Sequence, residues 1–178
     1  MAGLEDLYRE IILDHYRNPR HRGELECPPA RRSEGFNPLC GDEIVLTFET
    51  DGDTVSDLRV SGQGCSISQA SASMMSAAVI GKSTAEIRDL TRAFKAMMSI
   101  HEESIGGDGS ESLGGAGEHA NGDPAGEQPR LGDLEALRGV VKFPVRIKCA
   151  TLGWNALVSG LDELAASGLA ESGLAESP

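Results

Sequence analysis

The chain has no long hydrophobic run and no recognisable leader at its start. No stretch reaches the 18 or more apolar residues that a membrane-spanning helix needs. The first residues, Met1 to Asp6, lack the basic segment and the apolar segment of a secretory signal. We therefore expect no membrane partner and a cytoplasmic, reducing location. In such a compartment, cysteines are more often metal ligands or reactive thiols than members of disulfides.

Basic residues are few, with 16 Lys and Arg against 28 Asp and Glu and a net charge of −12. A nucleic-acid-binding domain needs a basic face, so the composition argues against a nucleic-acid partner. The acidity is concentrated, because residues 101–130 carry a net −6 and residues 161–178 a net −4. The other 130 residues therefore carry only −2. Acidic segments of this kind are solvated and say little about what the core binds.

Apolar residues make up only 39% of the chain, because polar segments dilute them. Residues 101–130 contain eight glycines and two prolines without periodicity, which is typical of a flexible insertion. The end of the chain repeats SGLAE twice and is of low complexity. We expect one domain over residues 1–164, with a flexible, glycine-rich acidic insertion at about 101–130 and a low-complexity tail at 165–178.

Hydrophobic periodicity predicts several helices around one antiparallel hairpin. The predicted helices cover residues 4–17, 66–80, 84–98, 131–138 and 149–164. The predicted hairpin pairs residues 43–50 with 54–61, while 18–38 is expected to be extended or looped and 142–147 extended. Ser83 and Glu86 form a capping-box pattern before the third helix. Strands and helices do not alternate, so the fold class is α+β, with a small antiparallel sheet packed against several helices.

Three cysteines and one aspartate carry the chemical information. Cys40 and Asp42 flank Gly41, which permits a sharp turn. Cys65 and Cys149 are each predicted to open a helix, where the helix dipole and free N–H groups would stabilise a thiolate. Sulfur and carboxylate ligands from separate segments suit zinc or an iron–sulfur cluster. No C-x-x-C pair is present, and the plainer alternative is that these cysteines are small buried hydrophobic residues.

Four segments resemble the U-type iron–sulfur cluster assembly proteins. They are residues 7–19 (LYREIILDHYRNP), 37–42 (NPLCGD), 62–68 (GQGCSIS) and 142–154 (KFPVRIKCATLGW). Three of these motifs surround a cysteine and occur in a fixed order, which makes the resemblance specific. It covers nearly the whole chain except the tail and part of the insertion.

The residue before the last cysteine distinguishes two branches of that family. The scaffold branch, IscU-like, carries a histidine there, whereas this chain has Lys148, which has no lone pair for a metal when protonated. Together with the insertion, this departure resembles the SufU branch. That resemblance implies a SufE/IscU-like fold and zinc held by Cys40, Asp42, Cys65 and Cys149.

The same resemblance implies that Cys40 accepts sulfane sulfur from a pyridoxal-phosphate cysteine desulfurase of the SufS type. The sulfur would then pass to a downstream iron–sulfur scaffold or apo-protein. The function expected is therefore that of a zinc-dependent sulfurtransferase, a persulfide carrier that stimulates the desulfurase. Arg146, which lies close before Cys149, would balance charge or steer the partner.

Two alternatives remain open at this stage. In the first, the chain is a scaffold on which Cys40, Cys65 and Cys149 hold a transient iron–sulfur cluster that Asp42 makes labile. In the second, zinc has only a structural role, although Asp42 weighs against this because closed structural sites usually use cysteine and histidine.

Of the other candidate residues, Cys27 is expected to be incidental. His15 is expected to pack or hydrogen-bond rather than bind a metal.

Overall fold

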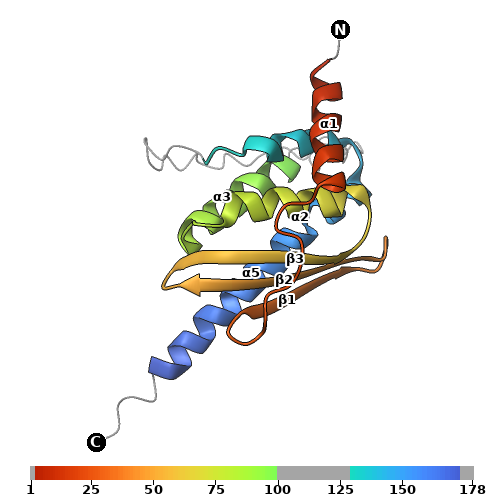
Figure 1. Cartoon of the computed structure of the whole chain (residues 1–178). Coiled ribbons are helices and arrows are strands. Elements are labelled where there is room, and N and C mark those ends of the chain that lie inside the picture. The colour runs from red at the N-terminus through yellow and green to blue at the C-terminus, as the bar shows by residue number, and fades with distance from the viewer. Residues whose placement is uncertain (1–2, 100–128, 173–178) are drawn as a thin grey trace, which may run out of the picture.

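The computed structural model describes residues 3–99 and 129–172 as helices around one small sheet (Figure 1). In chain order the elements are α1 (Leu4–Arg17), β1 (Arg31–Asn37), β2 (Asp42–Asp51), β3 (Thr54–Gln63), α2 (Ser66–Val79), α3 (Thr84–Ser99), the 3-10 helix η1 (Gly132–Lys142) and α5 (Pro144–Ser172). The predicted α+β class is confirmed. The predicted insertion lies almost entirely outside the described residues.

The sheet has three antiparallel strands in the order β1-β2-β3. Strands β2 and β3 form the predicted hairpin, with Leu46 opposite Val60 and Phe48 opposite Leu58. Strand β1 lies in the segment predicted to be extended or looped, but its pairing with β2 as a third strand was not predicted. Its sequence, RRSEGFN, is polar and shows no apolar alternation. Tertiary contact explains the strand, because the buried Ser33 hydroxyl donates to the carbonyl of Ala156 in α5 at 2.6 Å.

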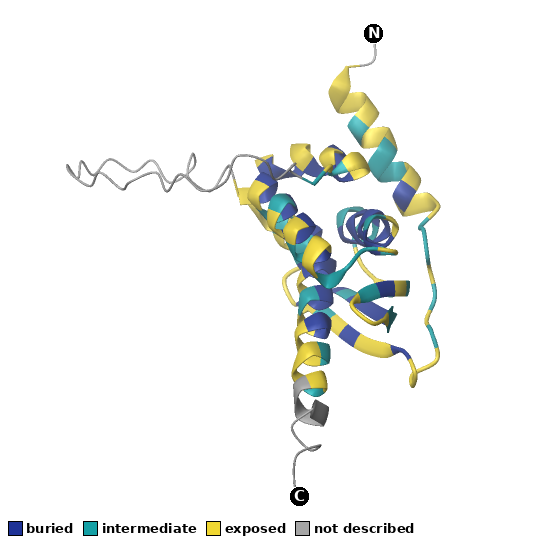
Figure 2. Ribbon diagram, turned by 90° about the vertical axis from the view of Figure 1, so that its left-hand side faces the viewer, coloured by how far each residue is buried: buried dark blue, intermediate teal, exposed yellow. Residues whose placement is uncertain are grey.

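Helices α2 and α5 pack against each other and against the sheet, while α1, α3 and η1 contact them from outside. Small residues allow close packing along α5, since a side chain at Gly160 would lie 2.8 Å from the ring of Phe48. The ring of Trp154 stacks on Phe94 with 4.9 Å between centroids. Figure 2 shows that burial concentrates at these contacts, whereas α1 is buried mainly near its C-terminal end.

The start of α5 corrects two predictions. Residues 142–147 are not extended and Cys149 does not open the helix, because α5 begins at Pro144. Proline suits the first position of a helix, where its missing N–H and fixed φ angle cost nothing. Cys149 consequently lies in the second turn. The helix also continues to Ser172, into the segment predicted as a low-complexity tail.

The other helix predictions agree with the structure apart from small differences in their ends. The capping box before α3 is present, because the backbone N–H of Glu86 donates to the Ser83 hydroxyl and the Glu86 carboxylate accepts the backbone N–H of Ser83. The short helix predicted at 131–138 is a 3-10 helix that runs four residues further, to Lys142. Within the described ranges, 3–99 and 129–172, no helix is long and apolar enough to cross a membrane.

Candidate metal and sulfur site

Cys40 lies on the four-residue loop that joins β1 to β2. The closing pair of this hairpin is Asn37 opposite Asp42. Gly41 adopts a φ of 69°, a left-handed conformation that favours glycine, and its N–H donates to the Asn37 carbonyl at 2.8 Å. The loop therefore turns sharply after Cys40, and the Cys40 thiol is exposed.

Asp42 is the first residue of β2 and is completely buried. One carboxylate oxygen, Oδ1, accepts the backbone N–H of Cys65 at 2.8 Å, and the other, Oδ2, lies 3.6 Å from the Cys65 Sγ. Gly64 passes directly beside this contact, since a Cβ there would lie 2.6 Å from Asp42 Oδ1. The carboxylate thus joins the start of β2 to the start of α2.

Cys65 caps the N-terminus of α2, as the sequence predicted. Its Sγ accepts the backbone N–H of Ser68 at 3.5 Å, and the Ser68 hydroxyl donates to the Cys65 carbonyl at 3.0 Å. Free N–H groups at a helix N-terminus favour a thiolate at this position. Cys65 is half-buried, between the exposed Cys40 and the buried Cys149 in its exposure to solvent.

The third thiol of the site is that of Cys149, which lies in α5. It is completely buried, and its Sγ lies 3.5 Å from the Sγ of the exposed Cys40. Ligand atoms of Cys40, Asp42 and Cys149 all lie within 4.8 Å of one another. Cys65 adjoins this group through Asp42. The four residues predicted as ligands therefore meet in space, although Cys65 stands slightly apart from the other three.

The donor set fits zinc. Zinc binds thiolate sulfur and carboxylate oxygen, and three cysteines with one aspartate supply four such donors from three segments. The same thiols could also hold iron, so donor chemistry alone does not separate a zinc site from a cluster site.

Electrostatics differ among the members of the site. Burial raises the pKa of the Cys149 thiol well above its usual range, and hydrogen bonds with Asp42 and Cys40 raise that pKa further. Cys149 is therefore protonated in the metal-free protein at neutral pH. The predicted stabilisation of its thiolate by a helix terminus does not apply, because Cys149 lies inside the helix.

Arg146 supplies positive charge beside the thiols. The sulfurs of Cys65 and then of Cys149 raise the pKa of Arg146, so its guanidinium faces both. Lys148, in contrast, is exposed and makes no contact with the three thiols in the described hydrogen bonds. Of the two cations before Cys149, Arg146 is the one placed to offset the negative charge of the site.

A groove of about 1070 Å³ opens beside Cys40. Its walls are residues of α1, the start of α2, the end of η1 and the first turn of α5, most of them apolar. Cys40 and Arg146 are among the residues that line it. The thiol that the sequence singled out as the sulfur acceptor thus faces a space large enough for a segment of another protein.

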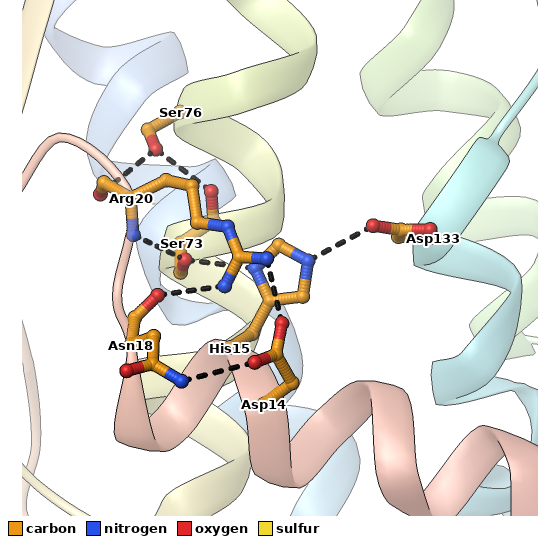
Figure 3. Close-up of polar contacts among 7 residues, drawn as sticks. All are labelled: Asp14, His15, Asn18, Arg20, Ser73, Ser76 and Asp133. Atoms are coloured by element: carbon orange, nitrogen blue, oxygen red, sulfur yellow. Dashed lines mark hydrogen bonds and ion pairs between the residues drawn. The ribbon is translucent and has the colours of Figure 1, made fainter.

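Two other candidates lie apart from the site. Cys27 is exposed in the loop before β1, and its thiol contacts only the carbonyl of Leu25, at 3.6 Å. His15 is buried and hydrogen-bonded, as expected, with Nδ1 2.8 Å from the Ser73 hydroxyl and Nε2 3.0 Å from Asp133 Oδ2 (Figure 3). This network joins α1 to α2 and η1 and contains no thiol.

The sequence reasoning missed Asn37. Its side-chain amide donates from Nδ2 to the Sγ of Cys149 at 3.7 Å, and it is 6% exposed. The Asn-Pro pair at 37–38 is a turn signal and could have indicated that Asn37 shapes the Cys40 loop. Nothing in the sequence could have indicated its contact with a residue 112 positions away.

Comparison with known proteins gives consistent results. Residues 7–109 match the family described as the NifU-like N terminal domain. Over 160 residues the chain is 43% identical to the zinc-dependent sulfurtransferase SufU of Bacillus subtilis (strain 168), covering 90% of this chain and 92% of that protein. Over 157 residues it is 41% identical to the iron-sulfur cluster assembly scaffold protein IscU of Streptococcus pyogenes serotype M1, covering 88% and 84%.

A solved structure also matches. It comes from Fervidobacterium islandicum AW-1 and is assigned as an iron-sulfur cluster assembly scaffold protein for the SUF system. The TM-score is 0.66 at 31% sequence identity, and the match covers 89% of this chain and 99% of that one. The α+β fold described above is thus shared with that structure.

Proposed function

Because the chain belongs to the NifU-like N-terminal domain family, we propose that it is a zinc-dependent sulfurtransferase of iron–sulfur cluster assembly that accepts sulfur at Cys40. One observation carries the proposal. An exposed thiol on a turn lies 3.5 Å from a buried thiol and beside a buried carboxylate. An exposed thiol can meet a donor from another protein, while the buried donors stay in place.

Cys40, Asp42, Cys65 and Cys149 are the residues that would hold zinc. When bound, zinc favours the thiolate form of its cysteine ligands and adds positive charge to the site. Asp42 lies in β2 and Cys149 in α5, and Cys65 is held as the N-cap of α2. Cys40 lies on the loop between β1 and β2, and it is the exposed cysteine of the three. The loop position makes Cys40 the ligand best suited to leave and react.

The reaction at Cys40 is thiol exchange with a persulfide. The Cys40 thiolate attacks the outer sulfur of a partner's cysteine persulfide. A sulfur–sulfur bond forms at Cys40, the sulfur–sulfur bond of the partner breaks, and the partner cysteine leaves as a thiolate. No external oxidant or reductant is needed. Arg146 supports this step by keeping a positive charge beside the accumulated thiolates.

The donor that fits is a pyridoxal-phosphate cysteine desulfurase of the SufS type. Two of the exposed large apolar side chains among the described residues, Phe143 and Val145, line the groove beside Cys40. A third, Leu39, is exposed and precedes Cys40 in the chain. An apolar surface around a reactive thiol supports docking of a protein rather than of a small thiol. We name this surface the docking face.

A desulfurase assay tests the proposal. A SufS-type desulfurase is supplied with cysteine, with and without this protein, and sulfide release is measured together with persulfide on each cysteine by mass spectrometry. We expect stimulation and a persulfide on Cys40. Cys40→Ala should abolish both, while Cys27→Ala, which removes the other exposed thiol, should change neither. Normal sulfur uptake by Cys40→Ala would disprove the proposal.

The scaffold function is the second candidate, favoured by the likeness to the Streptococcus IscU and to the SUF-system structure. It requires that the thiols hold a cluster and pass it on to an apo-protein. Lys148 at the position before Cys149 weighs against it, as the sequence indicated. Reconstitution with iron and sulfide distinguishes the two, because a scaffold develops the absorbance of a cluster and transfers it to an apo-protein.

A further inference from the structure

Asn37 contacts both the loop that carries Cys40 and the buried thiol of Cys149. Its Oδ1 accepts the backbone N–H of Leu39 at 3.1 Å, and its carbonyl accepts the N–H of Gly41 at 2.8 Å. Its Nδ2 donates to the Sγ of Cys149 at 3.7 Å. The side chain is almost fully buried, so these contacts replace water. One residue therefore joins two of the three segments of the site.

The orientation of the Asn37 amide follows from its partners. The N–H of Leu39 can only donate, so the amide atom that faces it must be the oxygen. The NH₂ group therefore faces Cys149, where sulfur is the acceptor. The opposite orientation would set a donor against a donor and leave buried groups unsatisfied.

A donor at one sulfur alone makes the two neighbouring thiols unequal. An N–H aimed at a sulfur stabilises its negative charge and fixes its direction, as outer-shell partners do for metal ligands. Cys149 receives this bond, whereas Cys40 receives none from a side-chain amide among the described residues. Of the two thiols 3.5 Å apart, Cys149 is therefore the one whose sulfur is oriented by a buried amide donor.

We propose that Asn37 is a positioning residue that anchors Cys149 as the retained sulfur ligand and sets the loop of Cys40 against it. The inference rests on the proposed function, in which the site binds zinc and Cys40 is the thiol that reacts. Asn37 itself contacts neither the partner protein's persulfide nor the metal. Its effect is to determine which of the two adjacent thiols remains a metal ligand when the other reacts.

Two substitutions separate the donor from the rest of the side chain. Asn37→Asp keeps an oxygen that can accept the Leu39 N–H, but as a carboxylate it has no hydrogen to donate to the Cys149 sulfur. Asn37→Ser keeps an oxygen that can accept the same N–H, but its hydroxyl lies one bond closer to the backbone than the Asn37 Nδ2 and so falls short of the Cys149 sulfur. Two variants are used so that the test survives if one fails to fold. Asn18→Asp is the matched control, because it makes the same chemical change in an exposed residue at the end of α1, outside the site.

Two measurements are made on purified full-length protein without a desulfurase. The first is zinc affinity, by competition with a chromophoric chelator. The second is the order in which the cysteines of the zinc-loaded protein react with iodoacetamide, by peptide mass spectrometry. We expect both Asn37 variants to lose about 10- to 100-fold in zinc affinity, the range typical of outer-shell partners. We also expect the preference for alkylation of Cys40 over Cys149 to fall several-fold.

The proposal is overturned if both Asn37 variants keep zinc affinity and alkylation order within twofold of the wild type. It is also overturned if affinity falls but the order does not change, because Asn37 would then support all ligands alike. Equal effects in Asn18→Asp would have the same consequence. Failure of the wild type to accept sulfur from a desulfurase would instead remove the proposed function and leave these measurements interpretable.

Discussion

The carboxylate of Asp42 accepts the backbone N–H of Cys65 at 2.8 Å, so a candidate ligand on β2 fixes the position of another on α2. The two residues are 23 positions apart, and the β2–β3 hairpin brings them together. Gly64, immediately before Cys65, fits between Asp42 and Ser68 because it has no side chain. This close approach leads to the first prediction.

We expect Gly64→Ala to disrupt the site. Its Cβ would lie 2.6 Å from both Asp42 Oδ1 and the Ser68 hydroxyl, so both must shift. Overpacking of this kind typically costs about 1–3 kcal/mol in the free energy of unfolding. Urea denaturation and zinc competition would measure the loss. Gly139→Ala is the control, because a Cβ there has nothing within 4 Å. Equal stability and zinc affinity in the two variants would contradict the prediction.

The stability of the metal-free protein should fall at alkaline pH. Cys149 ionises near its ordinary pKa of about 8.5 in the unfolded chain, but burial raises that pKa in the folded state. Above about pH 8.5 the unfolded chain therefore binds fewer protons, and rising pH favours unfolding. The stabilisation that the protonated Cys149 thiol contributes is fully present below about pH 8.5.

Urea denaturation of the reduced, metal-free protein between pH 7.5 and 9.5 checks this dependence. Cys149→Ala should flatten it, since the thiol that keeps its proton on folding is gone. Cys27→Ala should leave it unchanged, because that thiol is exposed. An unaltered pH dependence in Cys149→Ala would assign the effect to another group.

His15→Ala should destabilise the fold. The imidazole bridges the Ser73 hydroxyl and the Asp133 carboxylate (Figure 3). Its removal deprives the Ser73 hydroxyl of this hydrogen bond and creates a cavity between α1 and α2. We expect a loss of about 2–3 kcal/mol in the free energy of unfolding. Asp133→Asn should cost below about 1 kcal/mol, because Asp133 is 62% exposed and its amide can still accept a hydrogen bond. Similar losses in both variants would show that Asp133, not the buried ring, sustains the contact.

Phe143→Asp should weaken stimulation of the desulfurase about tenfold or more without unfolding the protein. Phe143 is exposed on the docking face, so a charge there costs little in the free chain and opposes apolar contact with the partner. Ala166→Asp, on an exposed position of α5 outside the groove, controls for the added charge. Titration of the desulfurase with each variant, by sulfide release, measures the difference. Full stimulation by Phe143→Asp would remove Phe143 from the interface.

The sequence predicted what local pattern determines. The apolar spacing of α1, the alternation of β2 and β3, and the capping box of Ser83 and Glu86 all appear in the structure. The four candidate ligands were also identified from motif and resemblance, and they lie together in the structure. Each of these features is encoded within a short stretch of residues.

Two features that the sequence did not reveal depend on distant contacts. Strand β1 exists because its polar residues pair with β2 and contact α5. The bond from Asn37 to Cys149 joins residues 112 positions apart. The start of α5 is different, because residues 142–147 were predicted to be extended although Pro144 is a local signal for a helix start. Local pattern could not reveal the first two features, but it could have revealed this one.

The continuous helix α5 has a consequence for how the site comes apart. Cys149 lies in a helix whose Leu157 and Leu161 are part of the central core, so its position is lost only when that core opens. Cys40 lies on a hairpin loop and can move while the core stays closed. Under increasing denaturant the two thiols should separate before the helices melt. The protein would then pass through a folded state in which Cys40 has left the buried ligands, which is the same displacement that sulfur acceptance requires.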